Sequence, residues 1–423
     1  MIWAIEKIDI MRQNRLDRQL RIEGWNQKAL ENAKVGVVGD DDLLASLYIM
    51  SAAALGINNI VVLAPVLNPI LVETAKKLNL RFILTHLEGF YTHPVMAELF
   101  EGCNLIVDLS HYGLANKLVL EKGFRENLPI IRGFCYEDHD DQGFNVFSYL
   151  RGREWRELEQ IISPYQMPNR HFDDGVLDTI IAGIVLEETK NILMGQNTSD
   201  DLISYKRKKL KTPNGQPKIL VVGSGALGIF VGLGLVYSKF SRITFMDPDV
   251  VEVTNLNRQV FFYDAIGESK AKTLSKKLNR LFGIDSNAQV AYFDINSDIA
   301  SHDVVFDCVD NFESRIVLSQ KCLDHGVILI SGGASADKGQ VVSYNPVDDG
   351  VTPAKLLGMY DIVKKRNPEA YQRERAACIY NPDPSVIMTN QITAGFMVDS
   401  YRMLLDGQTP KNIFYNSTCN TRF

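Results

Sequence analysis

Short apolar runs that end at a turn residue recur along this chain. The run at 34–39 (KVGVVG) matches the run at 218–223 (KILVVG), and the run at 60–65 (IVVLAP) matches the run at 243–248 (ITFMDP). A short apolar run bounded by Gly or Pro is typical of a strand that is buried on both faces of a parallel sheet. Each half of the chain is therefore predicted to open with the same pair of buried strands.

The two halves continue to match in the same order after these strands. LIVD at 105–108 matches VVFD at 304–307, and the segment at 182–195 (AGIVLEETKNILMG) matches the segment at 394–407 (AGFMVDSYRMLLDG). The last two segments are predicted to be the closing helices of the two halves. Ordered matches of this kind indicate that one unit of strands and helices occurs twice.

The repeat gives the expected fold class and domain boundaries. Alternating strands and helices predict an α/β protein with two tandem Rossmann-like domains, each a mostly parallel sheet with helices on both faces. The first domain is expected over 1–195 and the second over 218–423. The segment 196–217 is polar and contains Pro and Gly, so it is predicted to be a linker, with its basic run at 206–209 solvated.

Composition narrows the class of protein. The chain is 46% hydrophobic and 23% charged with a net charge of −6, which is ordinary for a globular protein and gives no sign of a nucleic-acid partner. The sequence shows neither a cleavable leader nor an apolar run of about 18 residues, so a cytoplasmic location without a membrane partner is expected. The six cysteines are scattered with no C-x-x-C pair, which argues against a zinc knot and a disulfide framework.

The second half carries a glycine-rich turn after its first strand. Gly223, Gly225 and Gly228 stand in GSGALG, where glycine allows a tight turn and lets backbone N–H groups approach phosphate at a helix N-terminus. Asp247 ends the next strand, 19 residues after Gly228, and an acid there typically binds ribose hydroxyls. These features are common to NAD, FAD and ATP enzymes, so a dehydrogenase remains an alternative at this point.

Polar residues after the second strand favour a triphosphate over a nicotinamide. Asn255, Arg258 and Gln259 lie in NLNRQ, and a loop of this kind supplies fixed donors for extra negative charge. Lys270 opens a basic helix in GESKAK and is interpreted as a further phosphate ligand. The alternative is that Lys270 is simply solvated, as most helical lysines are.

A polar segment, DCVDNFESR, follows the strand at 304–307. Ligands bind beyond the carboxyl ends of strands in such sheets, so Asp310 is well placed to hold magnesium against phosphate oxygens. Asn311 beside it is counted among the nucleotide-binding residues. Mg²⁺ and ATP are therefore the expected cofactor and nucleotide.

Six motifs together resemble the ThiF/MoeB and ubiquitin-activating-enzyme superfamily over nearly the whole chain. They are GSGALG, MDPDVVEVTNLNRQ, GESKAK, DCVDNFESR, SGGASADKGQ and TNQITAGFMVDSYRML. The resemblance implies a chain that adenylates the C-terminal carboxylate of a protein with Mg-ATP and releases pyrophosphate. It also implies ribose binding by Asp247 and magnesium binding by Asp310. The phosphate ligands that it implies are Asn255, Arg258, Gln259 and Lys270.

The first half has lost the nucleotide signals that the second half keeps. Its glycine turn reads Gly39-Asp40-Asp41-Asp42, so acids stand where phosphate would lie, and Ala64 replaces the ribose acid. His111 stands opposite Asp310. This half is therefore expected to be a degenerate domain that does not bind ATP.

The N-terminal segment RLDRQLR is similar to the R-Y-x-R-Q opening of the family. The resemblance implies that Arg18 reaches across a dimer interface to the ATP phosphates of the other unit. The degenerate first domain would then supply an arginine in trans, in a pseudo-dimer fused in one chain. The alternative is that Arg15, Arg18 and Arg21 form a solvated helix face.

Cys378 lies in RERAACIYNPDPS, just before the closing helix of the second half. In several members of the family a cysteine at about this distance takes the acyl group from AMP, and Arg373 and Arg375 would favour the thiolate here. The alternative is a buried structural thiol. The paired C-x-x-C motifs of many bacterial members are absent, so no zinc is expected.

The expected partner is a small ubiquitin-like or sulfur-carrier protein, with a possible downstream acyl acceptor. One alternative is a peptide-modifying enzyme that adenylates a short peptide with a free C-terminal carboxylate, as in nucleotide-peptide or RiPP-type biosynthesis. Another is a scaffold without catalysis. The sequence leaves open whether the product is a thioester, a thiocarboxylate, an amide or a phosphoramidate.

Overall fold

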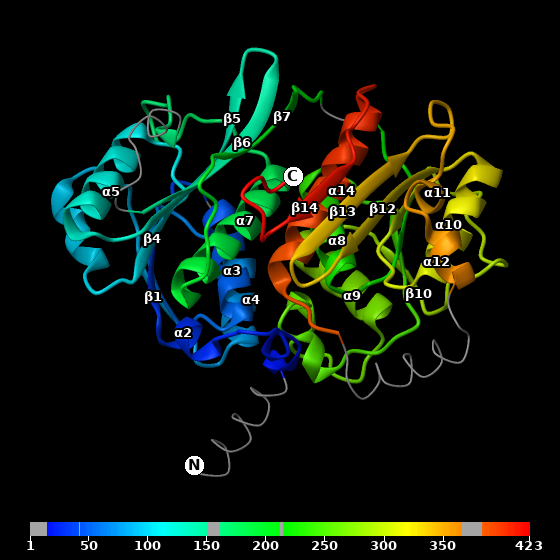
Figure 1. The fold of residues 1–423 in the computed structure, drawn as a ribbon, viewed down its shortest axis with the longest axis horizontal. Helices are drawn as coiled ribbons and strands as arrows, with labels where there is room; N and C mark the ends of the chain where they lie inside the picture. The colour runs from blue at the N-terminus through cyan, green and yellow to red at the C-terminus, as the bar shows by residue number, and fades with distance from the viewer. Residues whose placement is uncertain (1–14, 42, 151–160, 212–214, 366–382) are drawn as a thin grey trace, which may run out of the picture. The chain divides into compact units, whose positions relative to one another are not determined.

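The computed structural model describes residues 15–41, 43–150, 161–211, 215–365 and 383–423 (Figure 1). The chain forms two compact units. The N-terminal unit comprises Gly24–Leu210 with Asn416–Phe423, and the C-terminal unit comprises Lys211–Tyr415 with the described part of Met1–Glu23. Each unit is built around one sheet.

The N-terminal unit has a seven-stranded sheet in the order β3-β2-β1-β4-β5-β6-β7. Pairs from β3 to β5 are parallel, whereas β6 runs antiparallel to both β5 and β7. The strands are β1 (Lys34–Val38), β2 (Asn59–Leu63), β3 (Ile83–Leu87), β4 (Leu105–Asp108), β5 (Ile130–Asp138), β6 (Asp141–Tyr149) and β7 (Ile203–Lys208). The helices are α2 (Gln27–Asn32), α3 (Leu44–Leu55), α4 (Pro69–Leu78), the 3-10 turn η1 (Pro94–Phe100), α5 (Gly113–Glu126) and α7 (Gly175–Met194).

The C-terminal unit repeats this order as β10-β9-β8-β11-β12-β13-β14, with parallel pairs from β10 to β12 and β13 antiparallel to β12. The strands are β8 (Ile219–Val222), β9 (Ile243–Met246), β10 (Asn287–Gln289), β11 (Val304–Asp307), β12 (Ile328–Ala334), β13 (Lys338–Tyr344) and β14 (Ile413–Asn416). The helices are α8 (Ala226–Tyr237), η3 (Val253–Asn255), η4 (Val260–Phe262), α9 (Lys270–Phe282), α10 (Phe312–His325), α11 (Pro353–Leu356), α12 (Met359–Lys365) and α14 (Ile387–Leu405). The matching strand orders confirm the internal repeat.

Helices cover both faces of the C-terminal sheet, as predicted. Successive residues of a strand point to opposite faces. Val305 of β11 packs in a core cluster with Leu318 of α10, whereas the next residue, Phe306, packs edge-to-face on Tyr401 of α14. The buried, apolar strands of the sequence prediction are therefore sandwiched between two helical layers. None of the described helices is long and apolar enough to cross a membrane.

The predicted linker at 196–217 differs from the structure because it contains β7, which pairs with β6. Arg207 of this strand is 4% exposed and donates to Gln142 Oε1 and to Asp174 Oδ2 at 2.7 Å. The basic run is thus only partly solvated. Its period-2 pattern is hard to see in the sequence because an arginine, not an apolar residue, occupies the inward position.

The chain ends do not follow the predicted domain boundaries. Residues 15–23 belong to the C-terminal unit, although they precede the first repeat. The tail 416–423 belongs to the N-terminal unit, where Arg422 pairs with the buried Glu188 and Phe423 packs on Phe144. The C-terminal sheet therefore lies within its predicted domain, the N-terminal sheet extends into the predicted linker through β7, and both terminal segments join the unit of the other half.

Candidate nucleotide site

The glycine turn between β8 and α8 is held against the end of β11. Gly223 has φ +97°, and a Cβ there would lie 2.6 Å from the carbonyl oxygen of Cys308. A Cβ on Gly228 would lie 2.0 Å from the carbonyl oxygen of Gly223. Gly225 is the N-cap of α8, and a Cβ there meets only Gln259 Nε2, at 3.7 Å. Packing against backbone thus requires glycine at 223 and 228, whereas Gly225 leaves open the space in front of the N-terminus of α8.

This contrast predicts different effects of two alanine substitutions. Gly228→Ala is expected to destabilise the protein by about 1–3 kcal/mol, because its methyl group overlaps backbone. Gly225→Ala is expected to leave the melting temperature almost unchanged and to weaken ATP binding about tenfold, because its methyl group occupies space that phosphate needs. Thermal melts and calorimetric titration with Mg-ATP measure both. Full ATP affinity in a folded Gly225→Ala protein would show that the turn does not bind phosphate.

Asp247 connects the end of β9 to this turn. Its Oδ2 accepts a hydrogen bond from the backbone N–H of Ser224 at 2.6 Å, and its Oδ1 accepts one from the N–H of Asp249 at 2.8 Å. Burial raises the pKa of Asp247, and the charge of Lys270 opposes that increase. Lys270 Nζ lies 2.9 Å from Asp249 Oδ2, so an acid that sequence analysis did not single out holds this lysine near the ribose position.

The loop after β9 supplies buried polar side chains. Arg258 is 9% exposed and donates to Asn257 Oδ1 at 2.8 Å and to the carbonyl of Thr254 at 3.1 Å. Burial lowers the pKa of Arg258 to about 9, and Arg18 adds to this effect. Gln259 is also buried, and its Oε1 has no hydrogen-bond partner among the described residues. A buried guanidinium is stabilised by a bound anion, whereas the unpaired amide oxygen of Gln259 is stabilised by a hydrogen-bond donor or a cation.

Asn255 shapes this loop as well. Its side-chain oxygen accepts a hydrogen bond from the backbone N–H of Glu252 at 3.0 Å, in a capping box with that residue. The amide nitrogen of Asn255 is therefore the group that can donate to a phosphate. The sequence prediction named Asn255 but not this local role.

Residues 15–20 are helical and lie in the C-terminal unit with the loop just described. The fully buried Gln19 accepts a hydrogen bond from Asn257 Nδ2 at 3.3 Å, and Asn257 also donates to the carbonyl of Ser385 at 2.9 Å. Arg18 donates from its guanidinium to the carbonyl of Asp383 at 3.1 Å, while its Nε is buried without a partner among the residues that the structure describes. The alternative of a fully solvated helix face is wrong for Arg18 and also for Arg15, which is 7% exposed.

Three charged residues converge around this loop. The charges of Arg18 and Asp310 both act on the pKa of Arg258, the first lowering it and the second raising it. Burial also lowers the pKa of Arg18, and Glu252 opposes that decrease. Two desolvated guanidinium groups beside one exposed carboxylate fit a phosphate chain with a bound cation.

Asp310 and Asn311 lie between β11 and α10. Asn311 is the N-cap of α10, and its side-chain oxygen accepts a hydrogen bond from the N–H of Ser314 at 2.8 Å. Arg315 donates from Nε and from a terminal nitrogen to the carbonyl of Val309, at 3.0 and 2.8 Å, and also to the carbonyl of Gly332. Arg315 therefore fixes the loop that presents Asp310, while Asn311 has a structural role in addition to the nucleotide role predicted for it.

The donor set suits magnesium and ATP. Carboxylate oxygen is a preferred ligand of Mg²⁺, and Asp310 offers it at the carboxyl end of the sheet. Gln259 Oε1 on the loop and Ser224 Oγ in the turn are buried without a hydrogen-bond partner in the described part of the chain. The structure places Gln259 and Asp247 directly against the glycine turn. Cys378 lies outside the described residues, so its role stays a prediction.

A mostly parallel α/β unit with a glycine turn after its first strand and an acid at the end of its second strand defines a Rossmann-like domain. A model of the ThiF family matches residues 179–421, which is more than half of the chain. The chain therefore belongs to the ThiF family, as the motif resemblance predicted.

Two curated relatives and one solved structure illustrate the similarity. The chain is 33% identical over 167 residues to "Adenylyltransferase and sulfurtransferase MOCS3" of Xenopus laevis, covering 35% of this chain and 36% of the relative. It is 31% identical over 141 residues to "Molybdopterin-synthase adenylyltransferase" of Escherichia coli, covering 31% of this chain and 55% of the relative. The structure of Escherichia coli MccB with ATP matches 48% of this chain and 60% of its own at 19% identity, with a TM-score of 0.37. The chain thus spans about a third to a half of the length of the curated relatives it matches.

Proposed function

We propose that this chain uses Mg-ATP to adenylate the C-terminal carboxylate of a small protein. The observation that carries the proposal is the glycine turn at the end of a parallel sheet, bonded to Asp247 and accompanied by the buried Arg258, on whose pKa the charges of Arg18 and Asp310 act. The relatives named adenylyltransferases support the reaction class. ATP-dependent transfer to a carboxylate explains why cationic side chains gather here, since pyrophosphate is a highly charged leaving group.

In the proposed reaction a carboxylate oxygen of the substrate forms a bond to the α-phosphorus of ATP. The bond from that phosphorus to the bridging oxygen breaks, and pyrophosphate leaves with the electron pair. Asp310 would hold magnesium, which neutralises phosphate charge when it is bound. Arg18, Arg258 and Lys270 would stabilise the charge that builds on pyrophosphate, and Asp247 would orient the ribose.

A sulfur-carrier or ubiquitin-like protein is the proposed acyl substrate. Both curated relatives carry "adenylyltransferase" in their names, one of them together with molybdopterin synthase and the other with sulfurtransferase. The degenerate first half is proposed to contribute Arg18 through residues 15–23, which lie in the C-terminal unit. Acyl transfer to Cys378 is a further step that this proposal does not require.

The function is tested by ATP–pyrophosphate exchange with purified chain. A recombinant sulfur-carrier protein ending in Gly-Gly is expected to support exchange, and the same protein with a C-terminal amide is expected to support none, because the neutral amide has no carboxylate to attack the α-phosphorus. Short peptides with a free carboxylate form the second arm. Exchange with peptides alone would transfer the proposal to the peptide-modifying class, and exchange with neither would reject it.

A further inference from the structure

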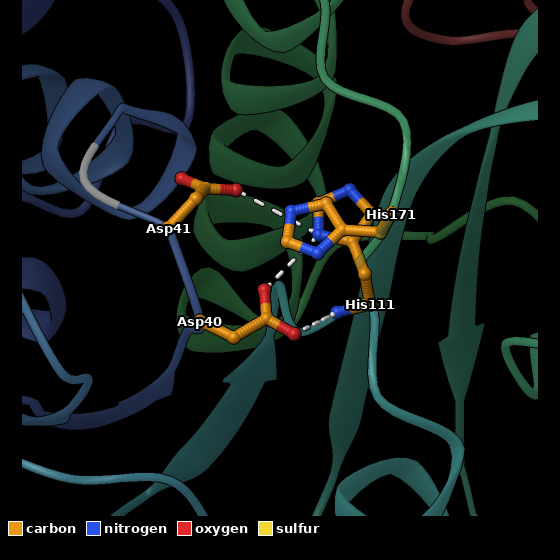
Figure 2. A group of neighbouring side chains, drawn as sticks. All are labelled: Asp40, Asp41, His111 and His171. Carbon is orange, nitrogen blue, oxygen red and sulfur yellow. Dashed lines mark hydrogen bonds and ion pairs between the residues drawn. The ribbon is translucent and has the colours of Figure 1, made fainter. Parts of the chain in front are cut away.

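Four side chains with metal-ligating atoms meet in the N-terminal unit (Figure 2). Asp40 and Asp41 follow β1, His111 follows β4, and His171 lies in the segment before α7. One ligand atom from each residue lies within 4.8 Å of the others. Because β1 and β4 match β8 and β11 in strand order, the group lies where the C-terminal unit has its nucleotide turn.

The contacts within this cluster are close and buried. His111 is fully buried, and its Nδ1 lies 3.1 Å from Asp40 Oδ1 and 3.7 Å from Asp41 Oδ2. The other oxygen of Asp40 accepts the backbone N–H of His111 at 2.6 Å. The rings of His111 and His171 are stacked, with centroids 4.0 Å apart and planes 5° from parallel.

Three side-chain atoms of the cluster are buried without a hydrogen-bond partner among the described residues. They are Asp41 Oδ2 and the two ring nitrogens of His171, of which Nε2 nevertheless lies within ion-pair distance of Asp173. The His171 side chain is 5% exposed, so its ring nitrogens are shielded from water. The other oxygen of Asp41 accepts the N–H groups of Leu43 and Leu44 at the start of α3. Buried polar atoms without partners cost free energy, and a metal ion bound to them removes that cost.

Groups outside the cluster hold the remaining nitrogen of each histidine. His171 Nε2 lies 2.8 Å from Asp173 Oδ1, and His111 Nε2 lies 3.5 Å from Cys135 Sγ. Histidines that bind metals usually have their second nitrogen held in this way, which orients the ring and sets its tautomer. An apolar pocket would not need such supporting partners.

The local charge also fits a cation. Burial, together with the charges of Asp40 and Asp173, raises the pKa of Asp41 to about 6 against the opposing effect of His111. Burial by itself would lower the pKa of His171, but Asp173 and Asp40 bring it above its ordinary value. These carboxylates therefore concentrate negative charge at the cluster. An open pocket lined in part by Tyr165, Arg170 and His171 lies beside the cluster.

We propose that Asp40, Asp41, His111 and His171 bind one divalent transition-metal ion, with Zn²⁺ the best match to two nitrogen and two oxygen ligands. Ligand distances of about 2.0–2.2 Å require the cluster to contract and the two rings to turn out of their stack. The ion would clamp the ends of β1 and β4 to the segment before α7. The prediction that no zinc binds considered only paired cysteines, and this ligand set contains none.

The test is metal titration of the nucleotide-free full chain after chelator treatment and dialysis. One equivalent of Zn²⁺ is expected to bind and to raise the melting temperature. Co²⁺ is expected to give d–d absorption without thiolate charge transfer, which distinguishes this site from binding by the free cysteines. The proposed metal site is rejected if neither ion binds stoichiometrically, or if the Co²⁺ spectrum shows thiolate ligation.

Two variants locate the metal site, and a third variant serves as the matched control. His171→Ala and Asp41→Asn are each expected to lower zinc affinity at least about tenfold, and asparagine retains the oxygen that caps α3. His139→Ala changes a histidine whose side chain is 94% exposed, and it should leave zinc binding unchanged. Zinc binding at full affinity in the folded His171→Ala and Asp41→Asn proteins would reject the proposal. Because no nucleotide is present, this outcome does not bear on the proposed adenylation.

Discussion

Replacing Asp310 by asparagine is expected to lower the rate of ATP–pyrophosphate exchange by about a hundredfold or more. The side chain is exposed at the end of β11, so the substitution should leave the melting temperature almost unchanged. Its carboxylate is the proposed magnesium ligand, and asparagine offers only a neutral oxygen. The expected loss therefore reflects weaker stabilisation of phosphate charge.

The magnesium dependence of exchange distinguishes the loss of a metal ligand from a general loss of activity. The Asp310→Asn protein is expected to need a higher magnesium concentration for half-maximal exchange than the unmodified chain. Asp361→Asn changes another exposed acid, on α12, and serves as the matched control with a normal rate. Exchange by Asp310→Asn within a few-fold of the unmodified chain, at unchanged magnesium dependence, would remove Asp310 from the mechanism.

Arg18→Ala is expected to have the largest effect, on the order of a thousandfold in exchange rate. Arg18 precedes the nucleotide turn by about 200 residues, yet its charge acts on Arg258 and its Nε is buried without a partner in the described part of the chain. A guanidinium can bind phosphate oxygens through two parallel hydrogen bonds, which a lysine ammonium cannot reproduce. Arg18→Lys should therefore recover only part of the rate.

Arg21→Ala is the matched control for this prediction. Arg21 lies on the same segment but pairs with Asp17, at 2.8 and 3.1 Å. Its substitution should leave exchange near normal. The loss of the Arg18 hydrogen bond to Asp383 should cost about 1 kcal/mol, or a few degrees in melting temperature, so both proteins remain folded. A normal rate for Arg18→Ala would show that residues 15–23 serve only packing.

Much of the fold is visible in the sequence because buried parallel strands are nearly continuous apolar runs. LIVD and VVFD become β4 and β11, and the closing segments become α7 and α14. β7 is not visible, since its inward residue Arg207 is charged and is buried only because Asp174 and Gln142 satisfy it. Patterns of polarity do not reveal partners that are distant in sequence.

The candidate nucleotide site could likewise be predicted from the sequence only in part. Asp247 and the glycines follow strands directly, so their meeting at one edge of the sheet follows from topology. The anchoring of Arg18 through Gln19 and Asn257 depends on tertiary packing across more than 200 positions, and only motif resemblance pointed to it. The metal cluster also needed the structure. The positions of Asp40 and His111 after matching strands suggest proximity, whereas His171 lies before α7, outside the matched runs of the repeat.

The central claim is that a carboxylate oxygen attacks the α-phosphorus of ATP. Transfer of an isotopic label from that oxygen to AMP tests this claim most directly. The carrier protein is prepared with ¹⁸O in its C-terminal carboxylate and incubated with the chain, Mg-ATP and hydroxylamine as acyl acceptor. Mass spectrometry of the products is expected to find one ¹⁸O in the phosphate of AMP, with unlabelled pyrophosphate. Label in inorganic phosphate with formation of ADP, or AMP without label, would contradict acyl-adenylate formation by this chain.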